Sequence, residues 1–291
     1  MPELPEVETV VRDLRPRVVG RVIRNITTGP RQLRTPWNDA WNDQLLGHRF
    51  LAIRRRGKWI IVELDSGSRL LVHLGMTGQL TAMPATEPQP DHLHLIFALD
   101  DESELRFRDV RRFGSARLLA DEETLQEFFT KAKLGPEPFQ LDPGYFRTAV
   151  HKANRSLKAI LLDQRVVAGV GNIYADEACS RAGLHPGRRG VRLTPAEVDR
   201  LRDAILEVIA HAIEHRGSTI RDYIGGSGLR GGFQEEFRVY GRTGEPCKTC
   251  GSAISRLVIA GRSSHFCPDC QRMNGRGAKS TSRIVKRSPR E

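Results

Sequence analysis

The chain begins Met1-Pro2-Glu3-Leu4-Pro5-Glu6-Val7-Glu8-Thr9-Val10, and this stretch decides how the rest of the fold is organised. Proline is favoured in the first turn of a helix, and carboxylates suit the positive end of the helix dipole. Apolar residues then recur at helical spacing, at Val7, Val10, Val11 and Leu14. The stretch therefore predicts a helix that starts just behind Pro2 and buries one face in a core.

The same stretch carries a candidate nucleophile. Pro2 is small, so we expect removal of Met1, which would leave a free secondary amine with the carboxylate of Glu3 beside it. An α-amino group has a pKa of about 7.7–8.0, so a useful fraction is neutral near pH 7. Attack of such an amine on a sugar carbon forms a permanently charged iminium that drives elimination, while an adjacent acid protonates the sugar oxygen. On these residues alone, the alternative is that the N-terminus begins a helix and has no chemical role. The two interpretations are compatible, because a helix would hold the nitrogen of Pro2 in place.

Composition points to an acidic partner. The 291 residues suggest about two domains, and the net charge of +11 is typical of proteins that bind nucleic acid. Seven basic residues and one acidic residue give residues 271–291 a net charge of +6, which leaves about +5 for the remainder. No apolar run is long enough to span a membrane and no secretory signal is present, so we expect an intracellular protein.

Residues 1–133 alternate like strands separated by short turns, which predicts a β-sandwich closed by a helix from Asp121 to about Lys133. The expected strands are 21–28, 49–56, 59–64, 69–74, 92–99, 104–108 and 115–119. Gly57 forms the tip of the hairpin between the second and third strands, and Lys58 there can project away from the sheet. The alternative is a solvated turn lysine.

Two other turns carry unusual side chains. Met76 lies between two glycines, and Arg111 and Phe113 lie on a turn between two strands. An exposed aromatic residue usually has a partner waiting, although Met76 could equally belong to the core and Arg111 could be solvated. For His73 and His92, the neighbouring sequence alone favours a structural role.

Gly135 to Pro138 forms a natural hinge to a helical half, with helices expected at 142–152, 157–164, 173–182 and from 195 to a stop at Gly217. Two glycines, Gly169 and Gly171, precede Asn172, which we expect to cap the third helix. Their bared amides could hold a phosphate, with an ordinary tight turn as the alternative. The glycine-dense stretch 224–233 is expected to be mobile.

The C-terminal cysteines predict a metal site. Cys247-x2-Cys250, sixteen residues and then Cys267-x2-Cys270 match a tetrahedral structural Zn²⁺ site, which an intracellular location favours over disulfides. The stretch 253–266 between them predicts a hairpin that turns at Gly261. Cys179 is a small core residue, and residues 275–291 are polar and basic enough to be disordered and to attract DNA non-specifically.

The N-terminal decapeptide and the string 161–177 (LLDQRVVAGVGNIYADE) resemble the formamidopyrimidine-DNA glycosylase family of bifunctional base-excision enzymes. The resemblance extends over about residues 1–273. It implies an α+β multidomain fold with an N-terminal catalytic β-sandwich domain (1–133), a helix–two-turns–helix DNA-binding domain (134–236), a four-cysteine zinc finger (237–273) and a disordered basic tail (274–291).

The resemblance also implies roles for individual residues. Catalytic roles fall on Pro2 as Schiff-base nucleophile, Glu3 as proton donor, Lys58 as proton donor for β-elimination, and Arg262 as proton donor for δ-elimination and phosphate contact. DNA-binding roles fall on Met76, His92, Arg111, Phe113, Lys158 and Asn172. An enzyme that acts on a base within a duplex must flip the nucleotide out, and Met, Arg and Phe side chains can fill the space it leaves.

The implied activity is removal of oxidised purines, 8-oxoguanine and formamidopyrimidines, from damaged double-stranded DNA, followed by β,δ-elimination to a one-nucleotide gap. One structural Zn²⁺, no membrane, a monomer and a bacterial-type cytoplasmic location at the nucleoid are also implied. The family often has Pro where Val110 stands, which affects only the turn. Three alternatives remain: an endonuclease VIII-like enzyme for oxidised pyrimidines, against which Leu4 and the long glycine-rich loop argue; a non-catalytic lesion binder; and a zinc-ribbon binding module.

Overall fold

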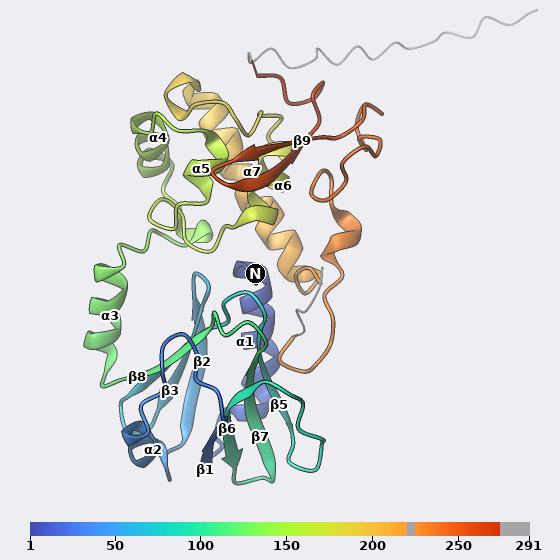
Figure 1. Ribbon diagram of the computed structural model, residues 1–291. Helices are drawn as coiled ribbons and strands as arrows, with labels where there is room; N and C mark the ends of the chain where they lie inside the picture. The colour runs from blue at the N-terminus through green and yellow to red at the C-terminus, as the bar shows by residue number, and fades with distance from the viewer. Residues whose placement is uncertain (220–224, 274–291) are drawn as a thin grey trace, which may run out of the picture.

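Helix α1 (Leu4–Val18) stands at the junction between a half built of sheets and a half built of helices in the computed structural model, which describes residues 1–219 and 225–273 (Figure 1). Its first residue, Leu4, belongs to the core of the helical half, whereas Val7, Val10 and Leu14 belong to the core of the sheet half. The helix thus contributes to both cores, which fixes the N-terminus between the two halves.

The sheet half consists of two four-stranded antiparallel sheets that share one core, as predicted for a β-sandwich. One sheet has the order β1-β6-β7-β5, with β1 (Ile23–Thr28), β5 (Gly78–Pro84), β6 (Leu93–Leu99) and β7 (Ser103–Asp109). The other has the order β2-β3-β4-β8, with β2 (Phe50–Arg56), β3 (Trp59–Leu64), β4 (Arg69–His73) and β8 (Ser115–Leu119).

Strand β5 and the short helix α2 (Ala40–Leu45) are absent from the sequence prediction. β5 begins at Gly78 and ends at Pro84, and both residue types disfavour strands in isolation. Pairing along the whole of β7, from Gly78 with Asp109 to Pro84 with Ser103, overrides that preference. The local sequence pattern around residues 78–84 does not reveal that β7 is the pairing partner of this strand.

Helix α3 (Glu122–Lys131) is capped by Asp121, whose carboxylate accepts a hydrogen bond from Thr124 N at 2.7 Å. Leu125 and Phe129 of this helix pack against Ile61 and Leu71 on the outer face of the second sheet. The chain then crosses to the helical half through residues 132–142, which include the short turn η1 (Pro138–Gln140).

The helical half comprises α4 (Pro143–Lys152), α5 (Leu157–Leu161), α6 (Asn172–Arg181) and α7 (Pro195–Glu214), with short turns η2 (Gly190–Arg192) and η3 (Phe233–Glu236). Its core includes Tyr174 and Cys179 of α6, so Cys179 is the core residue that was predicted. The α7 residues Leu201, Ile205 and Ile209 complete this core. No helix within residues 1–219 and 225–273 is both long and apolar enough to cross a membrane.

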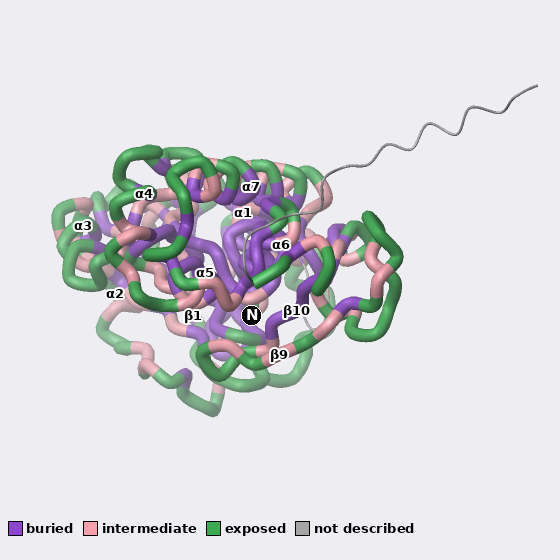
Figure 2. Tube along the Cα trace, turned by 90° about the horizontal axis from the view of Figure 1, so that it is seen from above, coloured by how far each residue is buried: buried purple, intermediate pink, exposed green. Residues whose placement is uncertain are grey.

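Strands β9 (Ser255–Ile259) and β10 (Arg262–Phe266) form the predicted hairpin, which packs on α6. Ala260 and Gly261 make its turn with φ values of 49° and 72°, so the glycine supplies a conformation that it adopts without strain. Viewed from above, the N-terminus lies among α5, α6 and this hairpin (Figure 2). The predicted basic tail, 274–291, and Ile224 of the glycine-rich stretch lie outside the described residues.

Candidate active site and DNA interface

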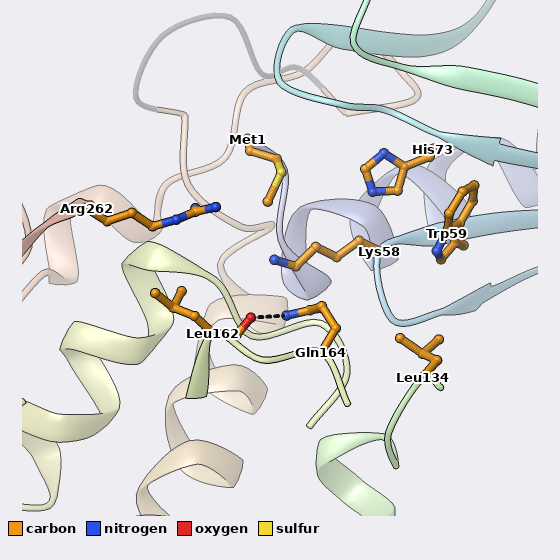
Figure 3. Close-up of a pocket in the computed structure, with 8 residues that line it drawn as sticks. All are labelled: Met1, Lys58, Trp59, His73, Leu134, Leu162, Gln164 and Arg262. Atoms are coloured by element: carbon orange, nitrogen blue, oxygen red, sulfur yellow. Dashed lines mark hydrogen bonds between the residues drawn. The ribbon is translucent and has the colours of Figure 1, made fainter. Parts of the chain in front are cut away.

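A pocket of about 170 Å³ surrounds the N-terminus, and side chains reach it from both halves of the molecule (Figure 3). Lys58 enters from the tip of the β2–β3 hairpin and Arg262 from the start of β10, on either side of Met1. The remaining lining residues are Trp59, His73, Leu134, Leu162 and Gln164. The fold therefore brings the predicted residues Lys58 and Arg262 to the chain terminus that carries Pro2 and Glu3.

Glu3 caps a helix from the opposite half of the chain. Its buried carboxylate accepts hydrogen bonds from the backbone N–H groups of Ile173, at 2.9 Å, and Tyr174, at 3.4 Å, in the first turn of α6. Asn172 was predicted to be the cap of this helix, and that prediction is wrong: Gly171 occupies the cap position and Asn172 is the first helical residue. A carboxylate of the protein satisfies the bared amides because these donors favour any anion.

The two glycines ahead of α6 make this approach possible. A Cβ atom on Gly171 would lie 2.4 Å from Cδ of Glu3, and one on Gly169 would lie 2.6 Å from Cβ of Leu4. Gly169 also has φ of +86°, and its carbonyl accepts a hydrogen bond from Leu4 N at 3.0 Å. Close packing of the N-terminal segment thus explains these glycines.

Burial sets the protonation tendencies at the site. It raises the pKa of Glu3, an effect that the nearby Lys58 ammonium opposes. It lowers the pKa of Lys58, which Glu3 opposes, and the Arg262 guanidinium lowers that pKa further. The pKa of the α-amino group, here on Met1, is also lowered by burial. Burial therefore shifts the acid and the amine toward their neutral forms, which is the direction that a proton donor and an amine nucleophile require.

A second buried carboxylate, Glu6, holds the N-terminal turn in place. It accepts hydrogen bonds from Glu3 N at 2.9 Å and from Ser218 N at 2.7 Å, and the hydroxyl of Tyr174 donates to it as well. Glu6 links α1 to α6 and to the segment after α7. From the sequence, Glu6 was expected only to suit the helix dipole, because its hydrogen-bond partners lie far along the chain.

Met76, Arg111 and Phe113 lie on two adjoining loops of the sheet half. Met76 and Phe113 are 40% and 45% exposed, and the Arg111 guanidinium carbon lies 4.7 Å from the centre of the Phe113 ring. The buried carboxylate of Asp109 joins the loops, since it accepts hydrogen bonds from the Thr77 hydroxyl, from Arg111 N and from Gly114 N. Asp109 is a positioning residue that the sequence analysis missed.

The other predicted DNA-binding residues have different surroundings. His92 is exposed, has φ of 68°, and accepts a hydrogen bond at its carbonyl from Asp109 N. The Asn172 side chain donates from Nδ2 to the Tyr240 hydroxyl at 3.4 Å. Lys158 is completely buried and paired with Asp176, so in this structure its ammonium presents no surface to a phosphate.

The glycine-rich stretch is anchored where it is described. Gly226 accepts a hydrogen bond at its carbonyl from Ala82 N, and the Ser227 hydroxyl donates to Asp13 at 2.9 Å. Arg216 pairs with the same Asp13 carboxylate at 2.7 Å. Residues 225–227 therefore lie against α1 and β5, beside the N-terminal helix.

Cys247, Cys250, Cys267 and Cys270 place their sulfur atoms within 4.8 Å of one another. The sulfur atoms of Cys250 and Cys267 are 3.4 Å apart and those of Cys247 and Cys270 are 4.0 Å apart, close to the roughly 3.8 Å edge of a tetrahedron with Zn–S bonds of about 2.3 Å. The backbone N–H groups of Thr249 and Cys270 point at sulfur atoms of this cluster, as expected for thiolates. These four residues fit one structural Zn²⁺ ion.

Three families match successive parts of the chain. They are the formamidopyrimidine-DNA glycosylase N-terminal domain over residues 1–116, the formamidopyrimidine-DNA glycosylase H2TH domain over residues 134–223, and a zinc finger found in FPG and IleRS over residues 244–272.

Individual proteins match over nearly their whole length. The formamidopyrimidine-DNA glycosylase of Desulforamulus reducens is 44% identical over 94% of this chain and 99% of its own. A complex of Lactococcus lactis Fpg with DNA containing an abasic site superposes with a TM-score of 0.87 at 38% identity, covering 93% of this chain and 99% of that one. MutM in complex with DNA containing carbocyclic 8-oxo-G superposes with a TM-score of 0.86 at 38% identity, covering 93% of this chain and 100% of that one.

Fold, site and zinc cluster together define a DNA glycosylase built of a β-sandwich, a helix–two-turns–helix region and a zinc finger. The chain belongs to the formamidopyrimidine-DNA glycosylase family.

Proposed function

We propose that this protein removes oxidised purines, such as 8-oxoguanine and formamidopyrimidines, from duplex DNA and then cleaves the abasic site as a lyase. The observation that carries the proposal is the buried Glu3 carboxylate beside the N-terminal nitrogen, in a pocket entered by the cations Lys58 and Arg262. Similar proteins bear the glycosylase name, and similar structures hold DNA with an 8-oxo-G analogue or an abasic site, which supports both parts.

The reaction starts once Met1 is removed and the Pro2 nitrogen is free. Its lone pair attacks C1′ of the flipped nucleotide, and the bond from C1′ to the base breaks with its electron pair leaving on the base. Glu3, whose pKa burial raises, gives a proton to O4′ as the sugar ring opens. The product is an iminium between Pro2 and C1′.

The iminium then withdraws electrons for two eliminations. Loss of a C2′ proton expels the 3′-phosphate, and loss of the C4′ proton expels the 5′-phosphate, which leaves a one-nucleotide gap with phosphates at both ends. Lys58 assists the first departure and Arg262 the second, since a cation placed at a leaving phosphate stabilises the charge that develops there.

DNA binding involves the loops of the sheet half and the start of α6. Met76, Arg111 and Phe113 fill the space left by the flipped nucleotide, Asn172 contacts a phosphate beside it, and His92 contacts the DNA nearby. Zn²⁺ on the four cysteines would brace the β9–β10 hairpin, and four thiolates leave it no open position for chemistry. We place the domain boundaries after residues 133, 236 and 273, and propose that the protein acts as a monomer.

Borohydride trapping tests the nucleophile. Reduction of the iminium should join the protein to duplex DNA with 8-oxoguanine, and peptide mapping should place the adduct on Pro2 in the fraction that mass spectrometry shows to lack Met1. Lys248→Ala, at an exposed lysine of the zinc finger, is the control and should trap as well as the parent protein. Absence of an adduct from Met-free protein, or undiminished strand cleavage by protein that retains Met1, would refute the proposal.

A panel of duplexes tests the substrate class. We expect excision of 8-oxoguanine and formamidopyrimidines to exceed that of oxidised pyrimidines such as thymine glycol. Faster excision of the pyrimidine lesions would assign the chain to the other substrate class.

A further inference from the structure

A buried ion pair lies beneath the β9–β10 hairpin. Lys158 of α5 and Asp176 of α6 meet at 2.7 Å from Nζ to Oδ1, and both side chains are completely buried. Neither residue lines the pocket around the N-terminus. The catalytic scheme above makes no use of either side chain.

The pair bonds three successive residues of β10. Lys158 Nζ donates to the carbonyl of Ser263 at 2.5 Å, the Ser264 hydroxyl donates to Asp176 at 2.9 Å, and His265 N donates to Asp176 at 2.9 Å. Ser264 is fully buried as a result. The middle of β10 is therefore fixed to α5 and α6 by charge-assisted hydrogen bonds.

Arg262 immediately precedes these three residues. Side chains two apart along a strand lie on the same face, so Arg262 leaves β10 on the face that Ser264 turns toward Asp176. Figure 3 shows the Arg262 side chain extending into the pocket opposite Lys58. The same helix, α6, holds Glu3 at its first amides and holds β10 through Asp176 one turn later.

Stability alone does not account for the pair. Desolvation largely cancels the attraction between two buried charges, and apolar replacements are often equally stable. An ion pair with these hydrogen bonds fixes the position and direction of the strand that it binds. An apolar pair does not do this.

We propose that Lys158 and Asp176 are positioning residues that aim Arg262 at the phosphate expelled in the second elimination. The inference rests on the proposed function, in which Arg262 serves that step. There, water takes the C4′ proton, the electron pair moves through the conjugated iminium, and the C5′–O bond breaks with its pair leaving on the phosphate oxygen. A misplaced Arg262 would slow this bond cleavage and leave the first elimination unaffected.

Product analysis on abasic duplex DNA provides the test, because gels separate the aldehyde-ended β product from the phosphate-ended δ product. Asp176→Asn and Lys158→Met should each raise the ratio of β to δ product at least about 10-fold, as Arg262→Ala should, while borohydride trapping stays within about 3-fold of the parent protein. Ser264→Ala removes one bond without stranding a charge and should raise the ratio less.

Folding is monitored separately by zinc content and thermal unfolding. The double variant Lys158→Met/Asp176→Asn strands no charge, so it should regain thermal stability over the single variants yet keep the high product ratio. Glu197→Gln breaks the mostly buried pair with Arg188, whose side chains are 10% and 13% exposed and which makes no bond to β10, and is the control. It should lower the melting temperature and leave the ratio unchanged.

The inference is overturned if folded Asp176→Asn and Ser264→Ala give the parent product ratio, or if trapping and both eliminations fall together. A parent protein that forms no borohydride adduct, or that stops at the β product, would instead contradict the proposed function.

Discussion

The carboxylate of Glu137 accepts a hydrogen bond from the backbone N–H of Gly57 at 2.6 Å, which joins the connection between the two halves to the tip of the β2–β3 hairpin. The same carboxylate pairs with Arg55 at 2.6 Å and with Arg56 at 3.0 Å. Lys58 follows Gly57 directly, so the segment that the sequence marks as a hinge also holds the hairpin that carries Lys58.

Replacing this carboxylate with an amide should loosen the hairpin. Arg55 and Glu137 are 10% and 12% exposed, so Glu137→Gln should cost about 2–4 kcal/mol of unfolding free energy and slow the first elimination more than Schiff-base formation. Denaturant unfolding and single-turnover cleavage would measure the two effects. Glu127→Gln, which breaks an exposed pair with Lys131 on α3, is the control and should change neither. Equal slowing of trapping and cleavage would contradict a specific effect on Lys58.

A methyl group at residue 171 should displace Glu3, the proposed catalytic acid. The added Cβ of Gly171→Ala would lie 2.4 Å from Cδ of Glu3, so the carboxylate must leave the first amides of α6. Displacement by about 1 Å can cost on the order of 100-fold in rate, and we expect a loss of that size in excision of 8-oxoguanine under single-turnover conditions. Gly144→Ala is the control, since Gly144 is exposed in the first turn of α4 and the nearest atom to an added Cβ would be Oδ1 of the exposed Asp142, at 3.2 Å. A Gly171→Ala protein with full activity would show that this contact does not fix Glu3.

Stability should fall in mild acid because of His73. Burial, together with the nearby Lys58 charge, lowers the pKa of His73 from 6.5 to about 4, and its neutral Nδ1 accepts a hydrogen bond from Gly75 N at 3.0 Å. Between pH 6.5 and about 4 the unfolded chain binds a proton that the folded chain does not, so the unfolding free energy decreases as the pH falls, by at most about 3 kcal/mol. His73→Asn should flatten this part of the pH profile in urea titrations. An unchanged slope in the variant would assign the acid sensitivity to other groups.

The sequence predicted those structural features that depend only on residues close together in the chain. The helix behind Pro2, the Gly57 and Gly261 turns and the four cysteines all follow from spacing and residue type, and the structure contains each of them. These features need no knowledge of the distant chain.

Residues whose hydrogen-bond partners lie far along the chain were not predicted, because spacing and residue type reveal only what depends on neighbouring residues. Glu137, Asp109 and Asp176 look like ordinary surface acids in sequence, yet each accepts several hydrogen bonds that position a candidate site residue. Asn172 was predicted to cap α6 because the sequence does not show that the carboxylate of Glu3, 170 residues before Ile173, accepts hydrogen bonds from the first amides of this helix. Sequence thus predicted the side chains that we propose contact DNA, and the structure adds the buried carboxylates that hydrogen-bond the segments on which those side chains lie.

Asp109 provides a test of whether a buried carboxylate positions the loops that carry the proposed DNA contacts. Its carboxylate accepts from the Thr77 hydroxyl and from the backbone N–H groups of Arg111 and Gly114, so Asp109→Asn places an amide N–H₂ against one of these donors. An unmet buried donor costs about 1–3 kcal/mol, and the Met76 and Phe113 loops should separate. We expect at least about 10-fold slower flipping of the lesion, measured by fluorescence of 2-aminopurine placed beside it, with trapping on single-stranded abasic DNA less affected because no duplex must be opened there. Asp101→Asn, in the exposed turn between β6 and β7, is the matched control and should flip the lesion at the parent rate. Normal flipping by a folded Asp109→Asn protein would mean that the two loops act independently, and the void-filling role would then rest on the exposed side chains alone.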